Sequence, residues 1–175
     1  MALHPEVQKK VQAEIHSNIG TRSPTMDDIH SLPYVMATLM EIQRLGLIAP
    51  GSLLHTLLEN TTYKDYVFEK GTVFVANLTK FLLDPLVFES PHNFNPDRFL
   101  DDNMKIRKYE QFVPFGIGKR ICMGESLAKN EMFLFFVRMM QRVSFEPTDN
   151  KPSIHNITTG ITRIPHPFEV KVKNT

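Results

Sequence analysis

Residues 112–125 have the sequence F-V-P-F-G-I-G-K-R-I-C-M-G-E, which contains Cys122, the only cysteine in the chain. Gly116 and Gly118 permit a tight backbone turn, because glycine adopts conformations that a Cβ atom disfavours. The residues that follow, 125–142, have the composition of a long helix. A helix N-terminus has unpaired N–H groups and partial positive charge, and both favour a thiolate over a thiol. The stretch therefore predicts a loop that presents Cys122 at the beginning of a helix.

Six residues of this stretch have the spacing F-G-x-G-x-R-x-C-x-G, and they are Phe115, Gly116, Gly118, Arg120, Cys122 and Gly124. The pattern resembles the haem-thiolate loop of the cytochrome P450 family. The sequence at 124–136 is similar to that of family 2, the microsomal branch that metabolises drugs. On this resemblance, which covers nearly all of residues 4–170, Cys122 is the metal ligand and the proximal ligand of the haem iron.

The resemblance implies an α+β fold that is mainly α, namely the C-terminal part of the cytochrome P450 fold. Its expected parts are helices, small β-sheets, an irregular meander and the cysteine loop, and residues 1–175 are expected to form the C-terminal portion of a single domain. Family members are much longer, and their membrane anchor and distal oxygen-activating residues have no counterpart in this chain. We therefore expect no catalytic residue on the distal side, no anchor and no signal peptide here.

The cofactor implied by the resemblance is haem b, iron protoporphyrin IX. Arg120 and His55 are then expected to bind its two propionates, because both side chains can donate hydrogen bonds to a carboxylate. Phe115 is expected to pack beside the sulfur, and Gly116 and Gly124 belong to the same cofactor-binding loop.

A second group of residues joins a helix to the meander. Glu41 and Arg44 are three residues apart, so they share a helix face and can form an ion pair. An exposed pair of this kind contributes less than about 1 kcal/mol. In the family a third residue, which is Arg98 within the segment N-P-D-R-F, completes a buried triad behind the cysteine loop. We expect this triad to act in folding and haem retention rather than in turnover.

The resemblance also implies a substrate pocket for a lipophilic molecule. Its expected residues are small or apolar, and they are Ala49, Pro50, Gly51, Ser52, Leu53, Thr159, Gly160 and Ile161.

Composition limits the other possibilities. The chain has 175 residues, 42% of them hydrophobic and 22% charged, which is typical of one globular domain. A formal net charge of +1 gives no argument for binding nucleic acid. A single cysteine excludes an internal disulfide and a four-cysteine zinc site. The longest apolar block, residues 132–137, is far shorter than the ~20 residues that span a membrane.

Periodicity and turn residues predict the remaining elements. We expect helices at 5–19, 34–45 and 125–142, a short helix at 77–83, and a strand at 52–58. A hairpin is expected from 63–68 and 72–76, with its turn at 69–71, and the proline-rich tail is expected to form paired strands. Residues 91–114 form the expected meander. The helix at 125–142 is apolar around most of its circumference, which predicts that it passes through the centre of a larger α-rich body.

Three functions remain open on these residues. The first is a haem-thiolate monooxygenase, or a fragment of one, that hydroxylates lipophilic small molecules with O2 and electrons from NADPH–cytochrome P450 reductase. Such a full-length protein is expected at the cytosolic face of the endoplasmic reticulum membrane. The second is a truncated, non-catalytic protein that acts through protein contacts. The third is an enzyme with Cys122 as nucleophile, although no histidine among His55, His92, His155 and His166 is singled out as its base.

Overall fold

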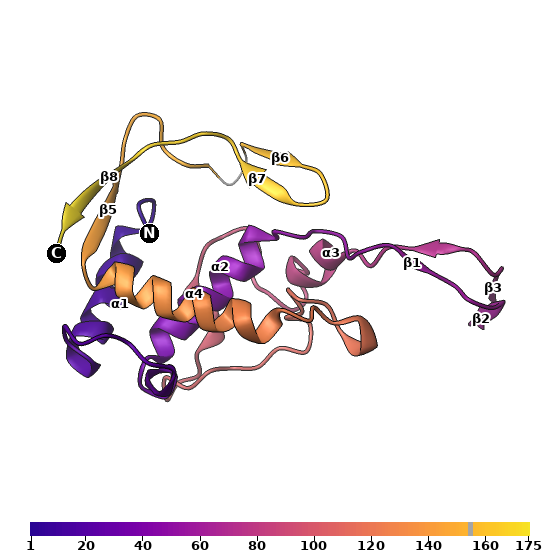
Figure 1. Ribbon diagram of the computed structural model, residues 1–175, viewed down its shortest axis with the longest axis horizontal. Coiled ribbons are helices and arrows are strands. Elements are labelled where there is room, and N and C mark those ends of the chain that lie inside the picture. The colour runs from indigo at the N-terminus through magenta and orange to yellow at the C-terminus, as the bar shows by residue number, and fades with distance from the viewer. Residues whose placement is uncertain (154–155) are drawn as a thin grey trace.

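Three long helices form the centre of the molecule in a computed structural model that describes residues 1–153 and 156–175 (Figure 1). They are α1 (Pro5–Asn18), α2 (Pro33–Gly46) and α4 (Glu125–Met140). Shorter helices lie between them: η1 (Met26–Ser31), α3 (Leu78–Leu82), η2 (Pro96–Phe99) and η3 (Gly118–Arg120). The bounds of α1, α2, α3 and α4 agree with the expected helices to within two residues at each end, whereas η2 and η3 are short helical turns in the expected meander and cysteine loop.

Helix α2 has a defined beginning and end. Pro33 occupies its first turn, where a missing N–H leaves no hydrogen bond unmade. The carboxylate of Glu14 on α1 accepts hydrogen bonds from the N–H groups of Tyr34 at 2.9 Å and Val35 at 2.8 Å. The helix ends at Gly46, and the next residue, Leu47, has a left-handed conformation with φ 44°. Glu14 therefore fixes the beginning of α2 against α1.

The core lies where α1, α2 and α4 meet. Val11, Val35, Phe133 and Val137 have no exposed surface there, and each comes from one of these three helices. An aromatic cluster around Phe99 extends the core into the meander. The centroid of the Phe99 ring lies 5.0 Å from that of Phe112, 5.6 Å from that of Tyr109 and 6.1 Å from that of Phe88. The meander is irregular in backbone but is held by buried aromatic rings.

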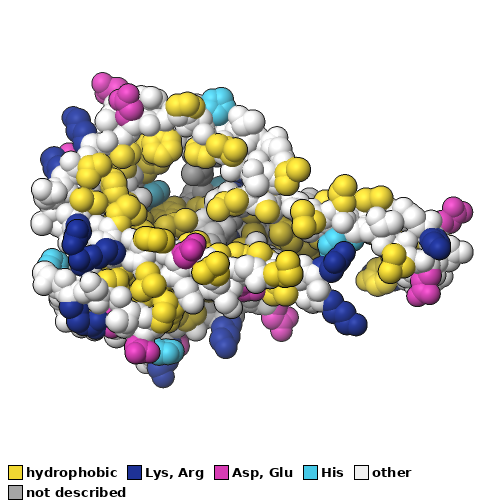
Figure 2. Space-filling view, viewed as in Figure 1, with side chains coloured by type: hydrophobic (Ala, Val, Ile, Leu, Met, Phe, Trp, Pro, Cys, Tyr) yellow, Lys and Arg dark blue, Asp and Glu magenta, His cyan; other side chains and the backbone are white. Residues whose placement is uncertain are grey.

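The strands form four two-stranded antiparallel sheets in the described residues. Near the C-terminus, β5 (Val143–Pro147) pairs with β8 (Val170–Asn174), and β6 (Ile157–Thr159) pairs with β7 (Arg163–Pro165). These strands arch over the helices, and Figure 2 shows an opening between the arch and the helical body. The paired strands expected in the proline-rich tail are therefore present.

The predicted hairpin was wrong in its register. The strands that pair are β2 (Thr61–Tyr63) with β3 (Tyr66–Phe68), and β1 (His55–Thr56) with β4 (Val73–Phe74). The turn between β2 and β3 falls at Lys64, which has φ 52°, within the stretch expected to be one strand. Gly71, with φ 90°, bends the chain between β3 and β4 instead. The expected strand at 52–58 is only two residues long, His55–Thr56. Strands β1 to β4 form an arm, the β1 arm, that projects from the helical body (Figure 1).

Within the described residues helix α4 is buried on one side only, so these residues do not by themselves form the larger α-rich body that its apolar sequence predicts around it. Phe133, Phe136, Val137 and Met140 face the core, but Leu127, Phe135 and Met139 are exposed by 64%, 71% and 43%. The described part of the chain packs α1, α2, η1 and β5 against α4 and leaves these three side chains exposed. A helix sequence that is apolar on every face predicts burial, but it does not show which segments cover each face.

Among the described residues, no helix combines the length and apolar character needed to cross a lipid bilayer.

Candidate functional site

The cysteine loop folds back on itself through backbone hydrogen bonds. The N–H of Cys122 donates to the carbonyl of Phe115 at 3.0 Å, and the N–H of Gly116 donates to that of Val113 at 3.0 Å. Gly116 and Gly118 have φ values of 80° and 72°, a left-handed region that disfavours a side chain. The two glycines predicted to bend the loop therefore do so, and Cys122 lies opposite Phe115 just before α4.

Cys122 is a free, exposed cysteine. A Cβ atom built on Gly124 would lie 3.9 Å from the sulfur, which is ordinary van der Waals contact, so Gly124 lies directly beside the thiol. Ile117, Ile121 and Met123 of the same loop are exposed by 69%, 43% and 102%. An accessible sulfur donor with exposed apolar neighbours suits a flat, largely apolar, metal-containing group, because such a group covers those side chains when it binds sulfur.

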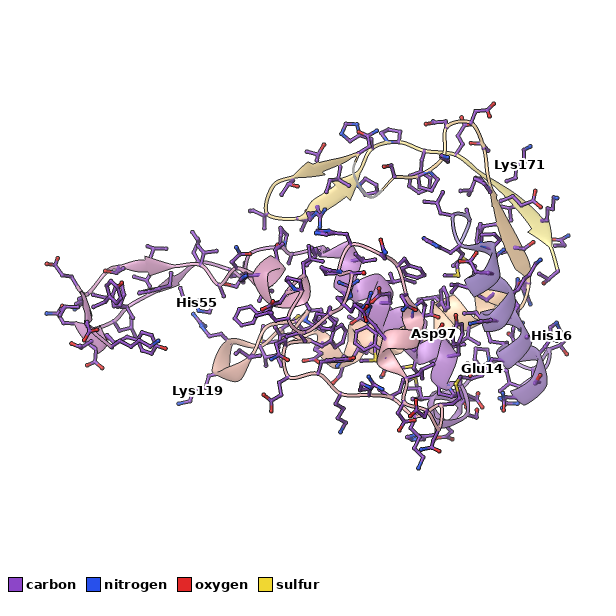
Figure 3. The ribbon with its side chains drawn as sticks, turned by 180° about the vertical axis from the view of Figure 1, so that it is seen from behind. Glu14, His16, His55, Asp97, Lys119 and Lys171 are labelled. Carbon is purple, nitrogen blue, oxygen red and sulfur yellow. The ribbon has the colours of Figure 1, made fainter. Side chains whose placement is uncertain are left out.

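The other residues expected at the cofactor lie on two different elements. Arg120 is exposed on η3, and Phe115 is half-buried with the Lys129 ammonium 5.7 Å from its ring centroid. His55 is half-buried on β1, outside the helical body. In Figure 3 its side chain points from β1 toward the loop that carries Lys119. The two residues expected to bind the propionates thus come from different segments, Arg120 from the cysteine loop and His55 from β1.

The structure brings Glu41, Arg44 and Arg98 together. Both Glu41 oxygens accept from Arg44, at 2.7 Å from Nε and 2.8 Å from Nη2, while Arg98 Nε donates to Glu41 Oε1 at 3.2 Å. The Glu41 and Arg44 side chains are completely buried and that of Arg98 is 7% exposed. The exposed ion pair that sequence spacing alone allows is therefore excluded.

Backbone groups complete the hydrogen bonding of this triad, and sequence reasoning missed them. The N–H of Asn95 donates to Glu41 at 2.9 Å, and Arg44 Nη1 donates to the carbonyl of Leu82 at 3.0 Å. Arg98 donates to the carbonyls of Glu89 at 2.8 Å and Asn93 at 3.2 Å. Main-chain partners leave no residue-type signal, so only the fold reveals them. Through these hydrogen bonds the triad connects α2 to the backbone of Leu82 on α3 and to the backbone of the segment 89–95.

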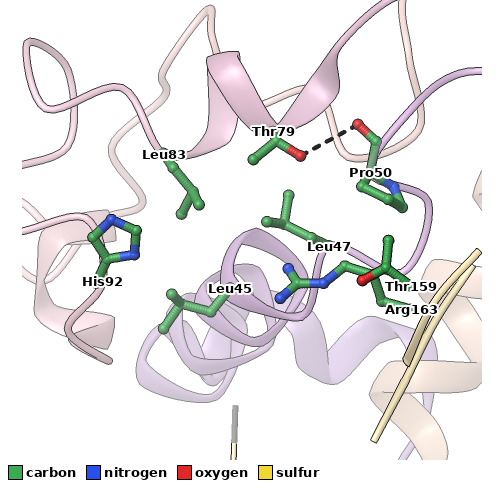
Figure 4. A pocket seen from close by; sticks show the side chains of 8 residues that line it. All are labelled: Leu45, Leu47, Pro50, Thr79, Leu83, His92, Thr159 and Arg163. Carbon is green, nitrogen blue, oxygen red and sulfur yellow. Dashed lines mark hydrogen bonds between the residues drawn. The ribbon is translucent and has the colours of Figure 1, made fainter. Parts of the chain in front are cut away.

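A cavity of about 350 Å³ lies between the end of α2, α3, the meander and the C-terminal strands (Figure 4). Its apolar walls are Leu45, Leu47, Pro50 and Leu83, and its polar walls are Thr79, His92, Thr159 and Arg163. The Thr79 hydroxyl donates to the carbonyl of Pro50 at 3.4 Å, which ties α3 to the segment after α2. The cavity has the size and apolar character of a small-molecule site.

Only two of the residues expected in a substrate pocket, Pro50 and Thr159, line this cavity. Gly51 and Ser52 pair with the chain near Ala76, while Leu53 and Ile161 are exposed by 77% and 83%. The remaining two residues, Ala49 and Gly160, are also exposed. The structure thus does not gather the eight residues around one cavity. His92 and Arg163, which do line it, were missed because a single polar residue in a loop or strand carries no periodic signal.

No histidine in the described residues is hydrogen-bonded to the Cys122 sulfur. His92 lies in the cavity wall, and His166 Nε2 lies 3.3 Å from Thr158 Oγ1. His155 falls outside the described residues. The expected arrangement for a cysteine nucleophile, a base within hydrogen-bonding distance of the thiol, is therefore not seen in this part of the chain.

Comparison with known proteins agrees with the loop and the fold. The family model described as Cytochrome P450 matches residues 1–172, so the chain belongs to the cytochrome P450 family. Similar proteins include Cytochrome P450 2U1 of Homo sapiens, 45% identical over 174 residues, and Cytochrome P450 2U1 of Rattus norvegicus, 47% identical over 174 residues. Cytochrome P450 2J1 of Oryctolagus cuniculus is 45% identical over 166 residues. The alignments cover 98%, 98% and 94% of this chain but 32%, 33% and 33% of those proteins.

The chain therefore spans about a third of the length of the relatives it matches, which are members of family 2. Its mixed α+β architecture is that of part of a cytochrome P450 fold. The family is one of monooxygenases that contain haem, and the accessible thiol with apolar neighbours fits that group.

Proposed function

We propose that this chain is the proximal, haem-binding part of a haem-thiolate monooxygenase that hydroxylates lipophilic small molecules. It corresponds to the C-terminal portion of a single cytochrome P450 domain, and the bound group is haem b. The observation that carries the proposal is the loop itself: the only cysteine of the chain is exposed just before α4, in a loop that also contains glycines and exposed apolar side chains.

In this proposal each group on the loop has a separate task. Cys122 supplies the thiolate ligand, and Phe115 packs beside it. Arg120 and His55 donate to the two propionates, while Gly116 and Gly124 leave room for a flat ring. When bound, haem supplies O2 activation and electron transfer, and a thiolate ligand favours cleavage of the O–O bond.

The triad of Glu41, Arg44 and Arg98 holds the meander behind the loop. A buried carboxylate between two guanidiniums is stable only while all three charges are present. We infer that this arrangement keeps the loop in the conformation that binds haem, and that it takes no part in turnover.

The full-length protein is proposed to act with NADPH–cytochrome P450 reductase on the cytosolic face of the endoplasmic reticulum membrane. Support comes from the similarity to family 2 proteins.

The test is spectroscopic. The purified chain is titrated with haemin, reduced and exposed to carbon monoxide, and we expect the red-shifted Soret band of thiolate-bound haem. Cys122→Ala should abolish that band, whereas Ser126→Ala, at a neighbouring exposed position on α4, should retain it. Failure of the unsubstituted chain to give the band, or its persistence in Cys122→Ala, contradicts the proposal. A chain that binds no haem at all fits the alternative of a non-catalytic protein that acts through its contacts.

A further inference from the structure

Met123 lies at the corner of the turn that connects Cys122 to α4. The N–H of Glu125 donates to the carbonyl of Cys122 at 3.3 Å, which closes the turn and leaves Met123 and Gly124 between its ends. The Met123 side chain is exposed by 102%, more than any other large apolar side chain in the described residues. Its thioether is therefore fully open to solvent, one position after the cysteine that is proposed to bind the haem iron.

The other methionines in the described part of the chain are less exposed. Met104 and Met139 are exposed by 50% and 43%. Met132 is half-buried, and its sulfur accepts a hydrogen bond from Gln43 Nε2 at 3.7 Å. Because an oxidant dissolved in water reaches an exposed sulfur more easily than a covered one, Met123 is the methionine that it attacks first.

Oxidation by a peroxide changes this side chain from apolar to polar. The thioether sulfur attacks one oxygen of hydrogen peroxide, so that an S–O bond forms as the O–O bond breaks. The proton on the transferred oxygen passes to the departing hydroxide, which leaves as water. Sulfur loses two electrons and the peroxide gains them. The product, methionine sulfoxide, is returned to methionine by methionine sulfoxide reductases, with a thiol as the reductant.

We propose that Met123 is a redox modification site that controls haem binding: its oxidation to the sulfoxide weakens the binding of haem at Cys122, and reduction restores it. The inference rests on the proposed haem site. Consecutive Cα atoms are about 3.8 Å apart, so a flat group held by the Cys122 sulfur comes within reach of the next side chain. Like Ile117 and Ile121, Met123 offers an exposed apolar surface that such a group covers. A sulfoxide oxygen loses its hydrogen bonds to water in that contact, and burying such a polar group lowers the affinity.

The first measurement needs no haem. The purified haem-free chain is treated with hydrogen peroxide and then with dithiothreitol, which returns a sulfenic acid or a disulfide of Cys122 to the thiol and leaves methionine sulfoxide in place. Peptide mass spectrometry follows the oxidation of each methionine over time. We expect Met123 to be oxidised at least twofold faster than Met104 and Met139, in line with the exposed fractions of the three side chains. Equal rates at the three positions overturn the proposal.

The second measurement is the affinity of the chain for haemin, taken from the Soret absorbance before and after the same treatment. We expect oxidation to weaken this affinity roughly tenfold, which is the effect of burying one polar group without a partner. Incubation with methionine sulfoxide reductases for both sulfoxide epimers should restore it. In Met123→Leu the affinities before and after peroxide should agree, whereas Met139→Leu, which keeps Met123, should show the full loss.

The outcomes separate this proposal from that of haem ligation. A chain that binds haem through Cys122 and keeps its affinity when Met123 is oxidised overturns the inference on Met123 alone. An equal loss in Met123→Leu does the same, because the loss then arises at Cys122 or at another methionine. A chain that binds no haem before oxidation contradicts both proposals, whatever the oxidation rates. Circular dichroism before and after peroxide distinguishes a loss of affinity from a loss of fold.

Discussion

Glu41→Gln is the substitution that most directly tests the structural role of the triad. The Glu41 carboxylate accepts four hydrogen bonds, two from Arg44, one from Arg98 and one from the N–H of Asn95. Glutamine has nearly the same shape, but it replaces one acceptor oxygen by an NH2 group. In either orientation of the amide, that group faces a donor of Arg44, and two buried guanidiniums lose their counter-charge.

The expected loss follows from burial. Removing one partner of a buried ion pair costs about 3–5 kcal/mol, because the remaining charge stays desolvated. The Glu41 and Arg44 side chains are completely buried and that of Arg98 is 7% exposed, so water cannot replace the carboxylate. With a urea m-value of about 2 kcal/mol/M, the loss lowers the unfolding midpoint by roughly 2 M.

The assay is urea unfolding followed by circular dichroism, with Glu146→Gln as the matched control. Glu146 pairs with Lys173 across β5 and β8, but the two side chains are 46% and 59% exposed. Loss of such a pair costs less than about 1 kcal/mol. In 1 M NaCl, where the screening length is about 3 Å, the control effect should disappear and the Glu41 effect should persist. Equal midpoints for Glu41→Gln and Glu146→Gln would refute the reasoning.

Three other substitutions test the triad, the loop and the beginning of η1. Arg98→Lys keeps the charge but loses most of the hydrogen bonds to the carbonyls of Glu89, Ser90 and Asn93, so urea unfolding should show a loss of about 1–3 kcal/mol. Gly116→Ala should destabilise the chain by about 1–2 kcal/mol through its positive φ alone, since no atom lies within 4 Å of the added Cβ. Gly46→Ala, where the added Cβ also meets nothing within 4 Å but φ is not positive, should be neutral or stabilising, and an equal loss in both alanine variants would contradict the role of the positive φ. Hydrogen bonds from Arg22 hold the pKa of Asp28 well below its ordinary value of 3.8, so this carboxylate stabilises the fold above pH 3.8 and the contribution is lost as the pH falls below it. Asp28→Asn should therefore lower the urea midpoint at neutral pH, and a difference from the unsubstituted chain that did not narrow in acid would disprove the role of the charge.

The sequence predicted the elements whose boundaries depend on local chemistry. Pro33 begins α2 because its missing N–H leaves no hydrogen bond unmade in the first turn, whereas at the other end Gly46 is still helical and Leu47 is the left-handed residue. Asn77 begins α3 by accepting the N–H of Lys80, which is the behaviour expected of a helix-capping asparagine. These features involve neighbouring residues only, so a single chain segment is enough to predict them.

Features that depend on distant partners were less predictable. The turn between β2 and β3 is at Lys64 and contains no glycine, so no sequence signal marked it. The hairpin turn was predicted at Gly71 instead, which lies between β3 and β4, two strands that do not pair with each other. The apolar circumference of α4 predicted burial in a larger α-rich body, whereas within the described residues α1, α2, η1 and β5 cover one face only. Arg163 drew no attention as one cation in a short strand, and only the packing of β7 against the end of α2 shows that it meets leucines.

The triad shows how these two kinds of information combine. Spacing predicts that Glu41 and Arg44 share a helix face, but spacing alone favours an exposed pair of little consequence. Burial changes that outcome, because it makes the carboxylate dependent on Arg98 and on the N–H of Asn95, both more than fifty residues away. The ring of Phe99, beside Arg98, packs on that of Phe112 at the beginning of the stretch that holds Cys122. Glu41 on α2 is thereby linked, through Arg98 and two aromatic rings, to Phe112, the first residue of the stretch that holds Cys122.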